Sequence, residues 1–502
     1  MHKNILRRFS ASSLLQCIRS KTFFKIFLGF FVFESLWIAL SGAYSMSFDE
    51  YFHYGIIKLY SHQWLPFIGH QPSSVDQFGA VTRDPSYLYH YLMSFPYRIF
   101  AHFFHAYTAQ IIMLRLWDIL FFTLGIIVFR RLFKVIGVSS LASNITLLFL
   151  TLLPVSSFVA AQVNYDDLLF LMTGLTLLSC VKLVEAIRDK DHIPVVQLLL
   201  VAALAMLTSI EKYAFLPILL GIALYLLLSI YREVGLHRLK LWSAIKRGTH
   251  GLRSRTGILI MIVFIISLGL FVERYGYNTI KYHNPVPECD QVLNTQRCNS
   301  YDPFARNYAY KQTGNKPSKK DKNNFALTWV RGMMRSLFFV VNNKQSNYTP
   351  GEPLAVAIIT GYTIGAVGMI LVLWNLKRLW QTSHAYQLFL VLIVVYIVTL
   401  YLQNIKFFLD FDVAVAIQGR YLLPVMPLIL ILVAQSSSFT LSRVATKYKA
   451  AVLILFLFCM FEGGGIVPFI VRSDPTWLWN SPVVNTLNQG ARDILKPIEI
   501  GA

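Results

Sequence analysis

Long apolar stretches alternate with short polar connections along most of the chain. A membrane-spanning α-helix needs about 20 predominantly apolar residues. The pattern predicts an all-α polytopic membrane protein with about eleven transmembrane helices. The expected spans are roughly 23–45, 109–129, 139–161, 167–184, 194–210, 213–231, 256–273, 354–376, 385–403, 420–437 and 450–471, with a tight turn at 209–212.

The composition agrees with this pattern. The chain has 502 residues, of which 55% are hydrophobic and 14% are charged, whereas about 25% of the residues of a soluble protein are charged. The formal net charge is +21, but the basic residues lie between apolar segments. We therefore expect a lipid bilayer as a partner and no nucleic acid.

Lysine and arginine mark every second connection, and short cytoplasmic loops carry such an excess. The predicted cytoplasmic connections include Arg130, Lys182, Arg232–Arg255, Lys377 and Arg443. This places the N-terminus, residues 1–22, in the cytoplasm of a multi-pass protein of a bacterial-type plasma membrane. The loops 46–108 and 274–353 and the tail 472–502 then lie outside the cytoplasm.

The predicted organisation has two groups of spans and two large outer loops. A transmembrane core covers 23–273 and includes the loop 46–108, and C-terminal helices cover 354–471. An interfacial amphipathic helix is expected at 87–104, and a second amphipathic segment at 325–341. Cys289 and Cys298 lie close together in the loop 274–353, where an extracytoplasmic setting favours a disulfide.

The stretch 47–53 follows the first apolar segment and carries Asp49, Glu50 and His53. In a helix these spacings of three and four place the side chains on neighbouring faces of one turn. Ionisable groups at a membrane are costly unless they are hydrated, paired or bound to a ligand. We interpret this stretch as the reaction centre.

Other polar residues collect on independent outer connections. If these connections meet, they form one site; the alternative is that outer loops are polar anyway and their charges only pair. Within the spans, Arg115 and Asp118 are expected to pair with each other because they lie three residues apart. The outer candidates are Arg83, Asp84, Asn164, Asp166, Asp167, Glu211, Lys212, Gln418 and Arg420.

Transfer from a lipid-phosphate donor fits these residue types. The acceptor hydroxyl needs a carboxylate to take its proton, and the departing phosphate needs fixed positive charge. Arg83, Lys212 and Arg420 are the phosphate-binding candidates. The expected orienting residues are His53, Asp84, Asn164, Asp166, Asp167 and Gln418.

An Asp-Glu pair just after the first span, a large first outer loop with surface helices, and many spans resemble the GT-C superfamily of membrane glycosyltransferases, which includes protein O-mannosyltransferases and aminoarabinose transferases. Four motifs in order are similar to those of a set of bacterial members. They are Asp49-Glu50-x-x-His53, 162–167 (QVNYDD), 211–217 (EKYAFLP) and 419–424 (GRYLLP). The resemblance covers most of 20–440 and is nearest to a set of bacterial members.

The resemblance implies inverting transfer from a polyprenyl-phosphate sugar to an extracytoplasmic glycan, lipid or protein acceptor. Asp49 is then the general base, and Glu50 its partner or a metal-site residue. A divalent cation held by Asp49, Glu50 and His53 is left open.

Three alternatives stand beside this hypothesis. A transporter or flippase of lipid-linked saccharides tolerates polar outer loops and expects charges near the bilayer midplane; Glu34, Arg115 and Asp118 favour it. A polymerase of surface glycans uses the same bond chemistry on a longer substrate. A purely structural membrane protein is the third.

Overall fold

The structure is a computed structural model that describes residues 11–46, 48–190, 192–233, 238–314, 316–338, 355–463, 466–473 and 475–497. In these ranges the chain forms α-helices joined by short 3₁₀ turns, with one isolated β-bridge between Gly42 and Leu478. No strand occurs in the same ranges.

The helices up to the second outer loop are α2 (Ala11–Arg19), α3 (Lys21–Ser41), α4 (Glu50–Tyr60), α5 (Leu88–Phe103), α6 (Tyr107–Val135), α7 (Ser140–Thr151), α8 (Pro154–Ala160), α9 (Tyr165–Lys190), α10 (Val195–Glu211), α11 (Leu216–Glu233), α12 (Arg238–Gly248) and α13 (Arg255–Phe271). The remaining helices are α14 (Tyr277–Tyr282), α15 (Cys289–Val292), α16 (Thr295–Cys298), α17 (Asp302–Thr313), α18 (Lys319–Leu337), α19 (Ala355–Trp374), α20 (Leu376–Thr382), α21 (His384–Phe411), α22 (Met426–Thr440), α23 (Thr446–Gly463), α24 (Ile466–Arg472) and α25 (Pro482–Leu495).

Several of these helices are suited to a membrane. Among the described residues, six are long and apolar enough to cross one, and two bent pairs, α7 with α8 and α19 with α20, raise the number to as many as eight. Each of the eleven predicted spans overlaps a helix, but α10 is shorter than the usual length of a span. Eleven spans therefore stay a prediction, while the membrane character holds.

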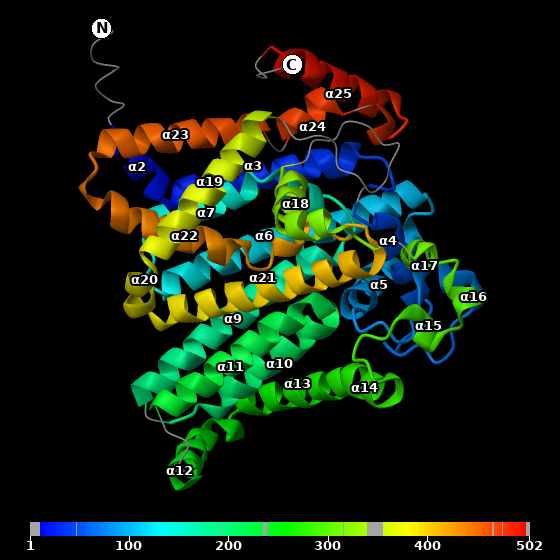
Figure 1. The fold of residues 1–502 in the computed structure, drawn as a ribbon, viewed down its shortest axis with the longest axis horizontal. Helices are drawn as coiled ribbons and strands as arrows, with labels where there is room; N and C mark the ends of the chain where they lie inside the picture. The colour runs from blue at the N-terminus through cyan, green and yellow to red at the C-terminus, as the bar shows by residue number, and fades with distance from the viewer. Residues whose placement is uncertain are drawn as a thin grey trace.

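The long helices run side by side and share two ends (Figure 1). At one end lie α4, α5 and α14 to α17, and we call this the Asp49 end. At the other end lie α12 and α20, which carry basic residues such as Arg238 and Lys377. The connections predicted as cytoplasmic and those predicted to hold the site thus lie at opposite ends of the helices.

Aromatic side chains pack the helices that support the site. The ring of Phe122 on α6 stacks on Phe170 of α9, with centroids 4.4 Å apart, and lies 5.3 Å from Phe31 of α3. A Cβ atom at Gly125 would lie 2.4 Å from the Phe170 ring, so the absence of a side chain there allows α6 and α9 to approach closely. All three rings are fully buried.

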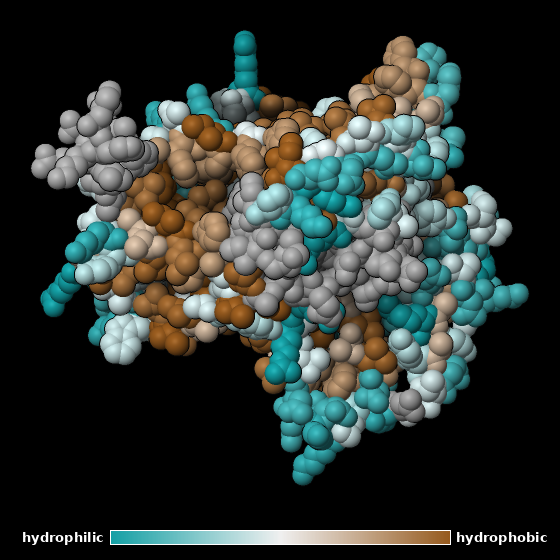
Figure 2. Space-filling view, turned by 90° about the horizontal axis from the view of Figure 1, so that it is seen from above, coloured by the Kyte–Doolittle hydropathy of each residue, from teal (hydrophilic) through white to brown (hydrophobic). Residues whose placement is uncertain are grey.

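The surface of the helices is apolar as well. On α13 the side chains of Leu259, Ile262, Ile265 and Ile266 are all exposed. Figure 2 shows hydrophobic residues gathered over the left of one face and hydrophilic residues gathered toward the right. Apolar side chains that face outward in such numbers match a lipid environment.

Local predictions have mixed outcomes. Helix α5 confirms a helix at 87–104, and α18 begins at Lys319 and covers 325–337 of the second amphipathic segment. Residues 339–341 lie outside the described residues, as does Ser47. A disulfide joins Cys289 and Cys298. The boundary predicted for the span 420–437 is wrong: Gly419–Leu422 is a 3₁₀ turn, and α22 begins at Met426 with Pro427 in its first turn, where a proline is tolerated.

Candidate active site

The loop between α3 and α4 presents Asp49 to solvent. Phe48 and Asp49 have φ angles of 69° and 73°, in the left-handed region that is uncommon for residues other than glycine. Asp49 is the N-cap residue of α4, but its side chain makes no capping hydrogen bond. Its side chain is 39% exposed, so the carboxylate is accessible to a ligand.

Glu50, the next residue, is buried and fully engaged. Its carboxylate accepts two hydrogen bonds from Arg115, at 2.7 and 2.8 Å, and one each from the backbone N–H groups of Met46 and Val163. Arg115 also donates to the carbonyl oxygens of Ala39 and Gly42 near the end of α3. These bonds fasten α3, α4 and α6 together below Asp49, and we assign Glu50 to that role.

The expected pairing of Arg115 with Asp118 is therefore wrong. Arg115 forms its ion pair with Glu50, and both side chains have no exposed surface. Asp118 instead accepts the hydroxyl of Tyr89, which lies 2.9 Å from both carboxylate oxygens. Spacing along α6 did not decide the pairing, because the first residue of α4, Glu50, lies within reach of Arg115.

Arg420 holds Asp49 from the other side. Its Nη2 lies 2.7 Å from Oδ2 of Asp49, its Nη1 donates to the carbonyl oxygen of Phe48 at 3.0 Å, and its Nε donates to Gln418 at 2.7 Å. The guanidinium is only 2% exposed. Gly419 allows this turn to pack against α18, since a Cβ atom there would lie 2.5 Å from the Met333 carbonyl oxygen.

Lys212 is the second cation of the site. Its Nζ pairs with Oδ1 of Asp166 at 2.5 Å, and Oδ2 of Asp166 lies 3.9 Å from Arg420. The ammonium group lies 4.1 Å from the centroid of the Tyr165 ring and 5.0 Å from that of Tyr421. Burial lowers the pKa of Lys212 to about 8, although Asp166 opposes the change.

Two predicted orienting residues act through the backbone or through Arg420. Asn164 donates to the carbonyl oxygen of Phe48 and accepts the N–H of Asp166, while Gln418 accepts from Arg420. Asp167 is fully buried, and its carboxylate oxygens have no hydrogen-bond partner in the described part of the chain. Asn164 and Gln418 thus position the groups that face the site.

His53 pairs with a second histidine. Its Nδ1 lies 2.9 Å from Nε2 of His90, and its ring lies 4.3 Å from that of Tyr165. Burial lowers the pKa of His53 well below its usual value, with contributions from His90, Arg420 and Lys212, and burial lowers that of His90 to about 3. Both imidazoles are neutral at pH 7.

The metal ligands considered from the sequence are not brought together. Glu50 forms an ion pair with Arg115, and His53 forms a hydrogen bond with His90. Across the described ranges, no group of three or more His, Cys, Asp or Glu side chains is arranged to hold a metal ion.

Arg83 lies apart from the other two predicted cations. It pairs with Glu273 at 3.0 Å and stacks over the Tyr277 ring at 4.3 Å. Asp84 accepts the N–H of Ser86, and burial raises its pKa. Two of the three predicted phosphate-binding cations therefore meet, and the third belongs to the contact between the loop 46–108 and α13–α14.

Tyrosines around the two cations were missed from the sequence. Tyr165, Tyr213 and Tyr421 each stand next to a predicted polar residue, and that adjacency was the available signal. Tyr301 comes from the second outer loop and had no signal. All four are partly exposed. The rings of Tyr165 and Tyr421 lie beside Lys212 and Arg420 and give the site aromatic walls next to its positive charge.

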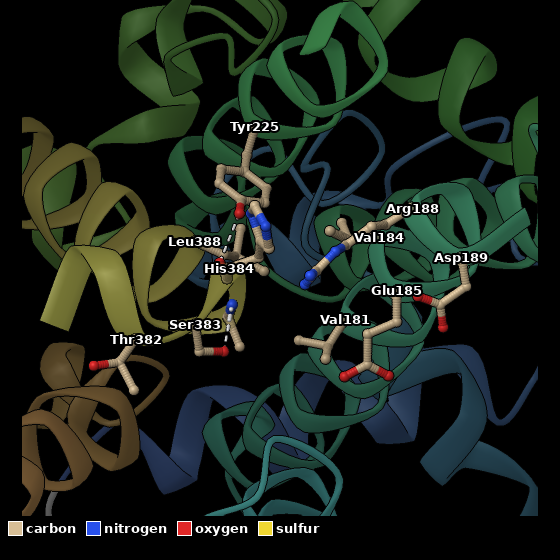
Figure 3. Close-up of a pocket in the computed structure, with 11 residues that line it drawn as sticks. Val181, Val184, Glu185, Arg188, Asp189, Tyr225, Thr382, Ser383, His384 and Leu388 are labelled. Atoms are coloured by element: carbon tan, nitrogen blue, oxygen red, sulfur yellow. Dashed lines mark hydrogen bonds between the residues drawn. The ribbon is translucent and has the colours of Figure 1, made fainter. Parts of the chain in front are cut away.

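A separate pocket lies at the other end of the helices. It has a volume of about 130 Å³ and is lined by Arg188 of α9, Tyr225 of α11 and His384 of α21, among others (Figure 3). The Tyr225 hydroxyl donates to the His384 carbonyl oxygen. Arg188 is near the last turn of α9, whereas Asp166 is in its first turn, so about 33 Å of helix separates this pocket from Lys212.

No protein-family model matches the chain, and no curated protein sequence matches it.

Proposed function

We propose that this protein is a membrane glycosyltransferase that transfers a sugar, with inversion, from a polyprenyl-phosphate donor to an extracytoplasmic acceptor. The proposal includes eleven spans, a cytoplasmic N-terminus, a GT-C-like fold and a bacterial-type plasma membrane. Its site lies at the Asp49 end, where Asp49 acts as general base and Lys212 and Arg420 bind the donor phosphate.

One observation carries the proposal. The partly exposed carboxylate of Asp49 lies 2.7 Å from Arg420, and Asp166 links Arg420 to Lys212. Four connections that are distant in the sequence supply these groups. A base next to two buried cations, at the end of apolar helices, matches a reaction in which a hydroxyl loses a proton while a lipid phosphate departs.

The charge balance of the site supports the same chemistry. In the free protein, Asp166 and Asp49 neutralise Lys212 and Arg420. An arriving phosphate can share these cations with the carboxylates, because Lys212 has more than one donor and Arg420 a planar fork. Oδ2 of Asp49 is held by Arg420, and Oδ1 remains to accept the proton of the attacking hydroxyl.

The test uses purified protein with a panel of polyprenyl-phosphate sugars and detects free polyprenyl phosphate by mass spectrometry. Asp49→Asn keeps the size of the side chain and removes the base, so release should fall by about 10²–10⁴-fold. The matched control is Asp493→Asn, an exposed acid on α25, which should retain wild-type turnover.

Two results would contradict the proposal. Near wild-type release by Asp49→Asn would remove Asp49 as the base. Movement of intact donor across vesicles without cleavage would favour a flippase instead.

A further inference from the structure

The segment Cys289–Tyr301, which we call the cap, closes over the loop 46–108. The disulfide joins its α15 to its α16, and both cysteines are buried. Although the cap begins 240 residues after Asp49 in the sequence, its α16 packs against the 3₁₀ turn Ser73–Phe78 of the loop 46–108. Figure 1 shows α15 and α16 at the Asp49 end. The cap is part of the loop 274–353, in which the sequence predicted no substrate-binding residue.

One ion pair docks the cap. Arg297, next to Cys298, donates to both carboxylate oxygens of Asp76, at 2.7 and 2.6 Å, and to the carbonyl oxygen of Gln71 at 2.9 Å. The Gln71 side chain in turn donates to Asp76 and to the carbonyl oxygen of Gly79. Such bidentate geometry gives orientation as well as attraction.

The docking places Tyr301 at the site. Its ring lies 6.1 Å from that of Phe52 on α4, and a Cβ atom at Gly79 would lie 3.0 Å from its Cε1 atom. Gly79 has a φ angle of +75°, so glycine suits both the backbone and the contact. Phe52 lies one turn after Asp49 on α4, so this ring contact places Tyr301 near the partly exposed carboxylate. Burial raises the pKa of Tyr301, and the Asp84 and Asp49 carboxylates add to the increase.

We propose that Tyr301 is a substrate-contacting residue that stacks on the sugar ring of the donor or the acceptor, and that the cap exists to hold it there. This inference rests on the proposed function. The apolar C–H face of a sugar ring can stack on an aromatic ring that lies beside the bound phosphate. The cations of the site do not provide such a surface. Phe52 and Gly79 contact the ring and hold it beside α4.

The experiment measures binding rather than turnover, by ligand-dependent thermal stabilisation of the full-length protein in detergent. The probes are citronellyl phosphate, citronellyl phosphate linked to glucose, mannose, galactose or arabinose, and the methyl glycosides of these sugars. For wild type, at least one sugar-linked phosphate should bind more tightly than citronellyl phosphate. In Tyr301→Ala the extra affinity that the sugar provides should fall roughly tenfold, while Tyr301→Phe should keep that extra affinity.

Undocking the cap should have the same effect as removing the ring. Arg297→Gln should lose the sugar-dependent gain and retain the binding of citronellyl phosphate, because Lys212 and Arg420 remain. Combining it with Tyr301→Ala should add nothing further. Arg306→Gln is the matched control, since that arginine is exposed and, within the described residues, its side chain donates hydrogen bonds to its neighbour Asn307.

The outcomes separate the two proposals. If wild type binds no citronellyl phosphate in any form, the proposed function fails and the role of Tyr301 fails with it. If the phosphate binds but no sugar, linked or as a methyl glycoside, binds in addition, or if Tyr301→Ala keeps both the sugar-dependent gain and the methyl glycoside binding, only the role of Tyr301 is overturned. Loss of the gain for the linked sugars places the ring on the donor, and loss of methyl glycoside binding alone places it on the acceptor.

Discussion

Replacing Glu50 by alanine should destabilise the protein far more than replacing Asp49. Glu50 accepts four hydrogen bonds, two of them from Arg115, and neither side chain of the pair is exposed. Removing one partner of a buried ion pair leaves the other charge without compensation, at a cost of about 3–5 kcal/mol. The Met46 and Val163 N–H groups also lose their acceptor.

Asp49→Ala should cost about 1 kcal/mol or less. Its side chain is 39% exposed, so water replaces much of what is lost. Arg420 keeps its bonds to Phe48 and Gln418 and stays near Asp166. Two adjacent acids should therefore differ by at least about 2 kcal/mol, because one fastens the helices and the other faces the ligand.

The assay is thermal unfolding of both variants in the same detergent, followed by intrinsic fluorescence. Glu50→Ala should lower Tm by several degrees and Asp49→Ala by much less. In the double variant Glu50→Ala/Arg115→Ala, the total loss should be clearly smaller than the sum of the single losses, because the two residues share one interaction. Equal Tm values for the two single variants would refute the assignment of Glu50 to structure.

The remaining predictions concern the cations of the site. Because Lys212 has a pKa of about 8, its charge is present below that pH and lost above it. Citronellyl phosphate should therefore bind less tightly as pH rises through 8, and Lys212→Arg should remove this dependence. A pH profile that is the same for Lys212→Arg as for wild type would contradict the role of Lys212. Gly419→Ala should displace the turn that carries Arg420 and reduce the affinity for citronellyl phosphate at least tenfold, because the new Cβ atom would lie 2.5 Å from the Met333 carbonyl oxygen. Gly29→Ala is the control, since a Cβ atom there would have no neighbouring atom within 4 Å, and this variant should bind normally.

Hydrophobic patterning predicted the helices well, because span length and apolar composition are local properties. It also indicated that Asp49, Lys212 and Arg420 belong together, since each follows or precedes an apolar segment at the same predicted face. Their distances depend on how the turns fold: Arg420 reaches Asp49 only because Gly419 fits against α18 and Phe48 adopts a left-handed conformation.

Partner choice among charges was beyond the sequence. Arg83, Lys212 and Arg420 look alike as candidates, yet Arg83 pairs with Glu273 while the other two share Asp166. Tyr301 carried no signal because its position depends on Arg297 and Asp76, which lie more than 200 residues apart. Long-range pairing of this kind requires the three-dimensional arrangement of the helices.

The Asp-Glu pair divides its two carboxylates between opposite tasks, and the backbone explains how. Glu50 is the first residue of α4 and points into the protein to meet Arg115, whereas the left-handed conformation at Asp49 turns the preceding carboxylate outward. The buried Glu50–Arg115 pair thus holds the loop before α4 in a conformation that it would not otherwise keep. Asp49 thereby gains a fixed position beside Arg420. On this reasoning the Glu50–Arg115 pair exists to orient Asp49, which is why its loss should reach the site as well as the fold.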